Sequence, residues 1–71
     1  MKLYTYINDE LIEIDDVTIC LESKEDLFRL EDFFKKYLKK MSMDSEFEHV
    51  HYKNFVEDDS SSDIVLFNKN K

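Results

Sequence analysis

The sequence predicts a single α+β domain of two layers, in which one helix packs on a mostly antiparallel sheet in the order β-β-β-α-β-β. Three observations predict it. The 71 residues suffice for one domain, 42% of them are hydrophobic, and stretches with a hydrophobic period of two flank one stretch with helical spacing. We expect the domain to span 1–71, with a small core and a frayed tail over 68–71.

The first two elements are expected to form a hairpin. Leu3–Ile7 has the Tyr, Thr and Ile content of a strand, and Glu10–Ile14 is a second extended run. Asn8 and Asp9 between them tolerate turn geometry, which matters because the chain contains neither Gly nor Pro. A third strand is predicted over Val17–Glu22, where apolar and polar side chains alternate most clearly.

A helix follows this third predicted strand. Ser23 fits the N-cap position, so the helix should begin at Lys24, with Glu25 and Asp26 placing negative charge in its first turn. Its apolar stripe is expected to consist of Leu27, Leu30, Phe34, Leu38 and Met41, and to be widened by Phe28, Phe33 and Tyr37. The lysines near its end complement the helix dipole, although they could also form a basic binding patch: Lys35, Lys36, Lys39 and Lys40.

The remaining chain predicts two more strands and an open sheet face. Glu46–Tyr52 returns to a period of two, 54–62 is a polar loop, and Ile64–Phe67 is the last strand. With one helix covering one face, we expect the other face to be open, with Val50 and Tyr52 pointing toward the helix. The side chains expected on the open face include Phe47, His49 and His51.

The charge and the cysteine content restrict the classes of function. Seventeen acidic and ten basic residues give a formal net charge of −7, which opposes direct binding to nucleic acid and favours a basic protein partner. Acidity can also serve solubility alone. A single cysteine, no signal-peptide-like apolar stretch and no membrane-spanning run predict a cytoplasmic protein that does not bind membranes.

Candidate chemistry is sparse. His49 and His51 would lie on the same side of a strand, and with Cys20 on a nearby strand they could offer zinc three ligands, but no fourth ligand has motif spacing. The histidines also lack a defined nucleophile or a phosphate-binding Gly loop. Glu57, Asp58 and Asp59 lack the Gly of a calcium loop. We therefore expect no metal, no cofactor and no catalysis.

Four parts of the chain carry a family resemblance: Val17–Leu21, the helix with Leu27, Leu30 and Phe34, Glu48–His51, and Ser62–Leu66. Through them the chain from Val17 onward resembles the bacterial immunity protein 32 family, whose members accompany polymorphic toxins. The resemblance covers roughly three quarters of the chain, and Asp63 departs from it, since a Glu followed by Leu is expected there. It implies a cytoplasmic protein that neutralises a cognate toxin, often a nuclease or another hydrolase with a basic surface. It also implies that His49 and His51 matter, by contacting the toxin or by holding strands together.

Beside a small enzyme or metal protein that would use His49, His51 and Cys20, three hypotheses for function follow. The first is a non-catalytic inhibitor whose acidic edge docks on a basic toxin. The second is a phage-type acidic inhibitor that mimics nucleic acid, and the third is a small structural homodimer joined through the open sheet face around Tyr4, Tyr6 and Phe47. The residues predicted to bind the partner are Asp15, Asp16, His49, His51, Glu57, Asp58 and Asp59.

Overall fold

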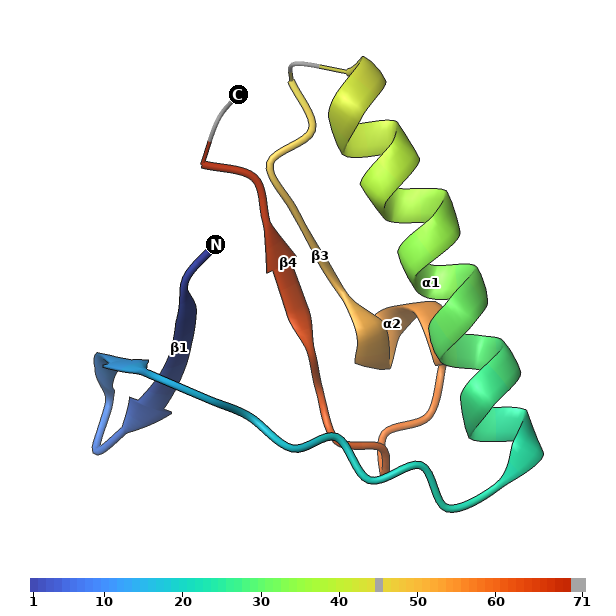
Figure 1. Ribbon diagram of the computed structural model, residues 1–71, viewed down its shortest axis with the longest axis horizontal. Helices are drawn as coiled ribbons and strands as arrows, with labels where there is room; N and C mark the ends of the chain where they lie inside the picture. Colours follow the sequence, from blue (N-terminus) through green and yellow to red (C-terminus); the bar gives the residue numbers. More distant parts are fainter. Residues whose placement is uncertain (45, 70–71) are drawn as a thin grey trace.

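A computed structural model describes residues 1–44 and 46–69 and confirms a small α+β protein with one main helix (Figure 1). The predicted element order is not observed, and the strands form two separate antiparallel pairs, β1 with β2 and β3 with β4, rather than one sheet. The elements are β1 (Leu3–Ile7), β2 (Glu10–Ile14), α1 (Lys24–Met43), β3 (His49–His51), α2 (Tyr52–Val56) and β4 (Val65–Phe67).

The predicted hairpin is confirmed. Leu3 lies opposite Ile14 and Ile7 opposite Glu10, and the turn between them has positive φ at both Asn8 (50°) and Asp9 (64°). Two consecutive residues with positive φ define the tight turn whose twist matches a hairpin. Asn and Asp occupy these positions because their short polar side chains tolerate the left-handed conformation.

The predicted third strand, Val17–Glu22, is wrong. The segment lies between β2 and the start of α1, runs beneath the second sheet in Figure 1 and belongs to no strand. Alternating side chains describe only which way residues face, whereas a strand also needs a neighbouring backbone. The segment must connect the hairpin to α1, and within the described residues β4 pairs with β3 instead.

Helix α1 begins at Lys24 as predicted. The side chain of Ser23 accepts a hydrogen bond from the Asp26 N–H at 3.1 Å, and the Asp26 carboxylate accepts one from the Glu22 N–H at 3.1 Å. The first bond satisfies a donor that the first helical turn leaves unpaired, and the second fixes the chain just before the N-cap. Ion pairs one turn apart, Glu25 with Arg29 and Glu31 with Lys35, add modest support on the exposed face.

The predicted fourth strand is shorter than expected. Only His49–His51 is a strand, and Tyr52 begins α2, so part of the predicted polar loop is helical. Glu57 ends α2 in the left-handed conformation with φ 55°, the position that Gly usually occupies. Asn68, at the start of the predicted frayed tail, donates its N–H to the Glu48 carbonyl at 2.7 Å; residues 70 and 71 of that tail lie outside the described part.

The core is an aromatic cluster between α1, α2 and the segment before β3. Phe33 is 0% exposed and Tyr52 8% exposed, and their rings meet edge to face at a centroid distance of 5.1 Å. Phe47 stacks on Tyr37 at 5.8 Å, so the prediction that Phe47 faces outward is wrong. Offset and edge-to-face aromatic pairs stabilise beyond their buried area. The cluster comprises Phe33, Phe34, Tyr37, Phe47, Tyr52 and Phe55.

The buried side of α1 differs from the centre of the predicted stripe. Leu27 and Leu38, both expected in the core, are exposed, as is Phe28. Phe33, expected to widen the stripe, is fully buried. It is buried because four other aromatic rings surround it. Across the stretches 1–44 and 46–69, no helix has the length and apolar character needed to cross a membrane.

Candidate partner-binding surface

The negative charge of the chain is concentrated near its start. Residues 1–26 hold eight acidic and two basic side chains, a net charge of −6, whereas residues 27–71 hold nine acidic and eight basic ones, a net charge of −1. Such an asymmetry produces a one-sided field that attracts cationic partners. The hairpin and the extended segment after it, residues 1–22, hold six acidic and one basic side chain, a net charge of −5 out of the −7 of the whole chain.

The same part of the chain exposes most of the apolar surface. Of fifteen large hydrophobic side chains exposed in the described residues, nine lie within residues 1–21. Tyr6 on the hairpin is 73% exposed and Val17 on the extended segment 57%. We call residues 1–22 the N-terminal arm. Aromatic and apolar residues within an acidic surround are typical of the centre and rim of a binding surface.

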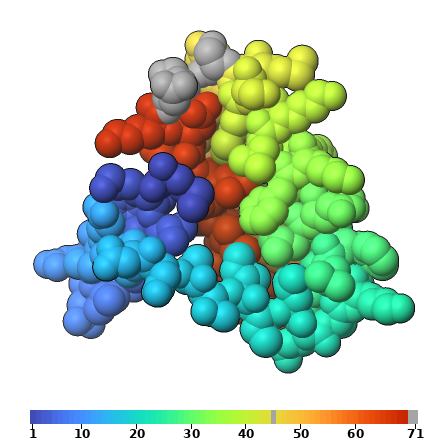
Figure 2. All heavy atoms as spheres, in the orientation of Figure 1, coloured from blue at the N-terminus to red at the C-terminus, as the bar shows by residue number. Residues whose placement is uncertain are grey.

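The total surface area is larger than that of a typical folded monomer of this mass. The chain exposes 6281 Å², whereas a folded monomer of 8.6 kDa exposes about 4,700 Å² by the size scaling of monomeric proteins. The excess of roughly 1,600 Å² is about twice the area that one partner contributes to a standard interface. Figure 2 shows the hairpin, in blue, to one side of α1, in green, with the cyan extended segment joining them along the bottom and orange-red residues from the C-terminal part of the chain between them.

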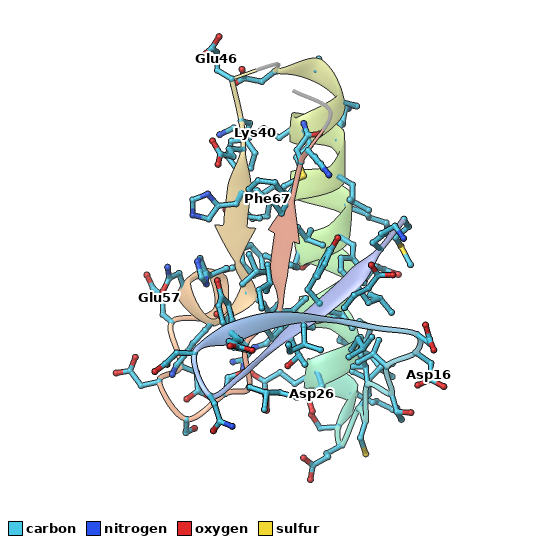
Figure 3. All side chains as sticks on the ribbon, turned by 90° about the vertical axis from the view of Figure 1, so that its left-hand side faces the viewer. Asp16, Asp26, Lys40, Glu46, Glu57 and Phe67 are labelled. Atoms are coloured by element: carbon cyan, nitrogen blue, oxygen red, sulfur yellow. The ribbon has the colours of Figure 1, made fainter. Side chains whose placement is uncertain are left out.

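The acidic residues predicted to bind a partner fall into two separate groups. Asp16 and Glu57, which represent the two groups, lie on opposite sides of the molecule in Figure 3. Asp15 and Asp16 join the hairpin to the extended segment, within the arm, and Glu57, Asp58 and Asp59 follow α2. The structure therefore does not bring these residues together into one acidic edge.

The acidic group after α2 organises its own loop. The Asp58 carboxylate accepts hydrogen bonds from the Ser60 hydroxyl at 2.7 Å and from the Ser60 N–H at 3.0 Å. These bonds hold the pKa of Asp58 below its usual value. Because Asp58 already has two donors, it is the least available of the three for a partner, and Glu57 is constrained by its left-handed backbone.

The predicted His51 site contains a carboxylate that sequence analysis did not assign to it. His51 Nδ1 lies 2.7 Å from Asp63 Oδ2, and Asp63 Oδ1 accepts from the Lys53 N–H at 2.9 Å. Partial burial acts to raise the pKa of Asp63, but the hydrogen bonds from His51 and Lys53 outweigh it and hold that pKa below its usual value.

The position of Asp63 explains the role of this pair. His51 occupies the N-cap position of α2 but makes no side-chain cap hydrogen bond, so Asp63 supplies the missing acceptor from the loop before β4. The pair thereby joins β3, α2 and the entry to β4. Its sequence signal is an Asp two residues before a strand, and that signal can be interpreted only once α2 is known to begin at Tyr52.

The zinc ligands that were considered do not assemble. The rings of His49 and His51 meet edge to face with centroids 5.6 Å apart, and Cys20 is exposed on the extended segment of the arm. Among the residues that the structure describes, no group of three or more His, Cys, Asp and Glu side chains could hold a metal ion.

A groove of about 570 Å³ lies between the extended segment, the first turns of α1 and the loop that precedes β4. One wall is residues 17–22, and the other includes the side chains of Ser60–Asp63. Tyr52 reaches its floor, where burial, followed by the negative charge of Asp26, raises the pKa of its hydroxyl. The groove therefore combines a phenol, carboxylates and an extended backbone.

The function of this chain has to be inferred from its sequence and structure. No protein-family model matches the chain, and neither a curated protein nor a solved structure matches it.

Proposed function

We propose that this protein is a non-catalytic, cytoplasmic inhibitor of the immunity-protein kind, which binds a basic protein through its N-terminal arm. The observation that carries the proposal is the coincidence of charge and apolar exposure: the arm, residues 1–22, holds a net charge of −5, and nine of the fifteen large hydrophobic side chains that are exposed in the described residues lie in the first 21. Apolar contacts supply affinity, and the surrounding carboxylates steer a cationic partner and select against anionic ones.

The arm is also the part of the chain that most needs a partner. A two-stranded hairpin is marginally stable in water unless it packs against another surface. Here the hairpin exposes Tyr4 and Tyr6 on one side and Ile7 on the other. A partner that covers the hairpin would therefore stabilise the arm, because it would bury the exposed apolar side chains of the hairpin against apolar surface of the partner.

His51 and Asp63 have a structural role in this proposal. A His held by a carboxylate occurs in catalytic sites, but Asp63 divides its oxygens between His51 and the α2 backbone, which ties down two elements. The proposal assigns His49 and His51 to the β3 framework and assigns partner contact to Asp15 and Asp16.

The test is binding to the basic protein encoded beside this chain in its genome. The dissociation constant is measured by calorimetry at 50 mM and 500 mM salt, where screening of exposed charges differs strongly. We expect a one-to-one complex that weakens at least tenfold at the higher salt. A complex that is indifferent to salt would argue against acidic docking, and a stable dimer of this chain alone would favour the structural homodimer.

Two matched variants locate the contact. Asp15→Lys/Asp16→Lys reverses two charges in the arm, and Glu57→Lys/Asp59→Lys reverses two on the opposite side at the same net charge. We expect the first variant to weaken binding by about tenfold or more and the second to change it less than threefold, since only the first places cations against the partner. Equal effects would mean that net charge, rather than the arm, decides binding.

A further inference from the structure

The extended segment of the arm, residues 17–22, has the side-chain pattern of a strand without a strand's hydrogen bonds. Within the residues that the structure describes, no hydrogen bond reaches the backbone from Val17 to Leu21. Exposed backbone groups in extended conformation are a template on which another strand can pair. Residues 17–21 thus have the alternation of a strand and a backbone that is free to pair with another strand.

We propose that residues 17–22 form a strand-addition edge, on which a β-strand of the basic partner pairs in the antiparallel sense. The inference rests on the proposed function and specifies how that partner is held. Backbone hydrogen bonds from the partner would complete the strand, and its alternate side chains would contact Val17, Ile19 and Leu21, which are all exposed.

The charges at the ends of the segment define the partner's strand. Asp15 and Asp16 precede the segment and Glu22 closes it, so both ends are anionic. A strand with an apolar or β-branched centre and Lys or Arg at each end would place opposite charges side by side at both ends. This is the chemistry that distinguishes the proposed occupant from strands in general.

A second copy of this chain fits the edge less well. Antiparallel self-pairing centred on Ile19 would set Asp16 opposite Glu22 twice, and like charges directly opposite each other destabilise a strand pair. It would also join two chains that each carry a net charge of −7. A strand with cationic ends avoids both the opposed carboxylates and the repulsion between two negatively charged chains.

The groove beside the segment gives such a strand a place to lie. Its volume of about 570 Å³ is bounded on one side by residues 17–22 and on the other by the loop before β4. Carboxylates line it at Asp26, Asp58 and Asp63, next to the single Arg29. Partner side chains that point into the groove would thus meet a polar, mainly anionic wall.

The test uses synthetic strand peptides with the full chain. The probe has a core of alternating Val and Thr with two Lys at each end; one control has Glu at the ends, and another carries N-methyl groups on alternate backbone nitrogens. We expect saturable binding of the probe and at least tenfold weaker binding of both controls, because the first reverses the charge and the second removes the hydrogen-bond donors of one edge. Amide exchange of 17–22 should slow at every second residue, as an antiparallel ladder requires.

The outcomes separate this inference from the proposed function. Equal affinity for the N-methylated peptide, with weak binding of the Glu peptide, would overturn strand addition and leave acidic docking intact. Equal affinity for the Glu peptide would contradict the charge argument on which the proposed function depends. No binding of any peptide, or protection of 17–22 that accompanies a doubled mass in light scattering, would also overturn the inference.

Discussion

Replacing Phe33 by Leu should destabilise the fold far more than the same replacement at Phe28. Both residues lie on α1, but Phe33 is 0% exposed and Phe28 is 64% exposed. Phe33 meets four aromatic rings, those of Phe34, Tyr37, Tyr52 and Phe55, at centroid distances from 5.1 to 5.9 Å. Leu removes these ring contacts but keeps much of the apolar volume.

We expect Phe33→Leu to lower the free energy of unfolding by about 1.5–3 kcal/mol, below the cost of truncation to Ala. A domain of this length has roughly 4–10 kcal/mol in total, so the variant should remain folded. With a urea slope of about 1 kcal/mol per molar, the unfolding midpoint should fall by roughly 1.5 M or more.

Circular dichroism at 222 nm during urea titration measures this shift. Phe28→Leu is the control on the same helix, and we expect its free energy of unfolding to change by no more than about 0.5 kcal/mol. Equal shifts for the two variants would refute the placement of the core, because they would mean that the two rings are equally buried.

Further substitutions test the local geometry. Ser23→Ala should cost about 1 kcal/mol in the same urea titration, because it removes the cap on the Asp26 N–H. Asp9→Gly should slow amide exchange in the hairpin by roughly fivefold, because Gly adopts positive φ without a steric cost. The pKa of Asp63 lies below its ordinary 3.8, so its stabilisation is present above that pH and is lost as the pH falls through the lowered value. Asp63→Asn should therefore reduce stability at pH 7 and make the loss between pH 5 and pH 2 less steep.

Local sequence signals predicted the hairpin and the start of α1 because the interactions concerned are local. Asn8 and Asp9 determine the turn through their own backbone preferences, and Ser23 caps the helix within one turn. No tertiary partner is needed for either. The same holds for the α+β class, which follows from the two periodicities alone.

Features that depend on distant partners were missed. Val17–Glu22 has a strand's alternation, but pairing requires a neighbour that sequence periodicity cannot name. Tyr52 was expected at the end of a strand, yet it begins α2, whose N-terminus is capped by Asp63 from eleven residues further along the chain. Phe47 was expected to face outward, but stacking on Tyr37 turns it toward the core.

The predicted binding residues also depend on contacts between distant parts of the chain. The sequence shows that acidic residues are concentrated near the start of the chain. It could not show that Asp16 and Glu57 lie on opposite sides of the molecule. Distance along the chain carries no information about which acidic groups share a face. Only the fold separates the group in the arm from the group after α2.

The most direct test of the central claim is amide hydrogen exchange of this protein alone and in complex with the basic protein encoded beside it. We predict that protection on binding is strongest across the N-terminal arm, residues 1–22, and weak across 46–69. Protection centred on β3, α2 and β4, with an arm that exchanges as fast as in the free protein, would contradict the account.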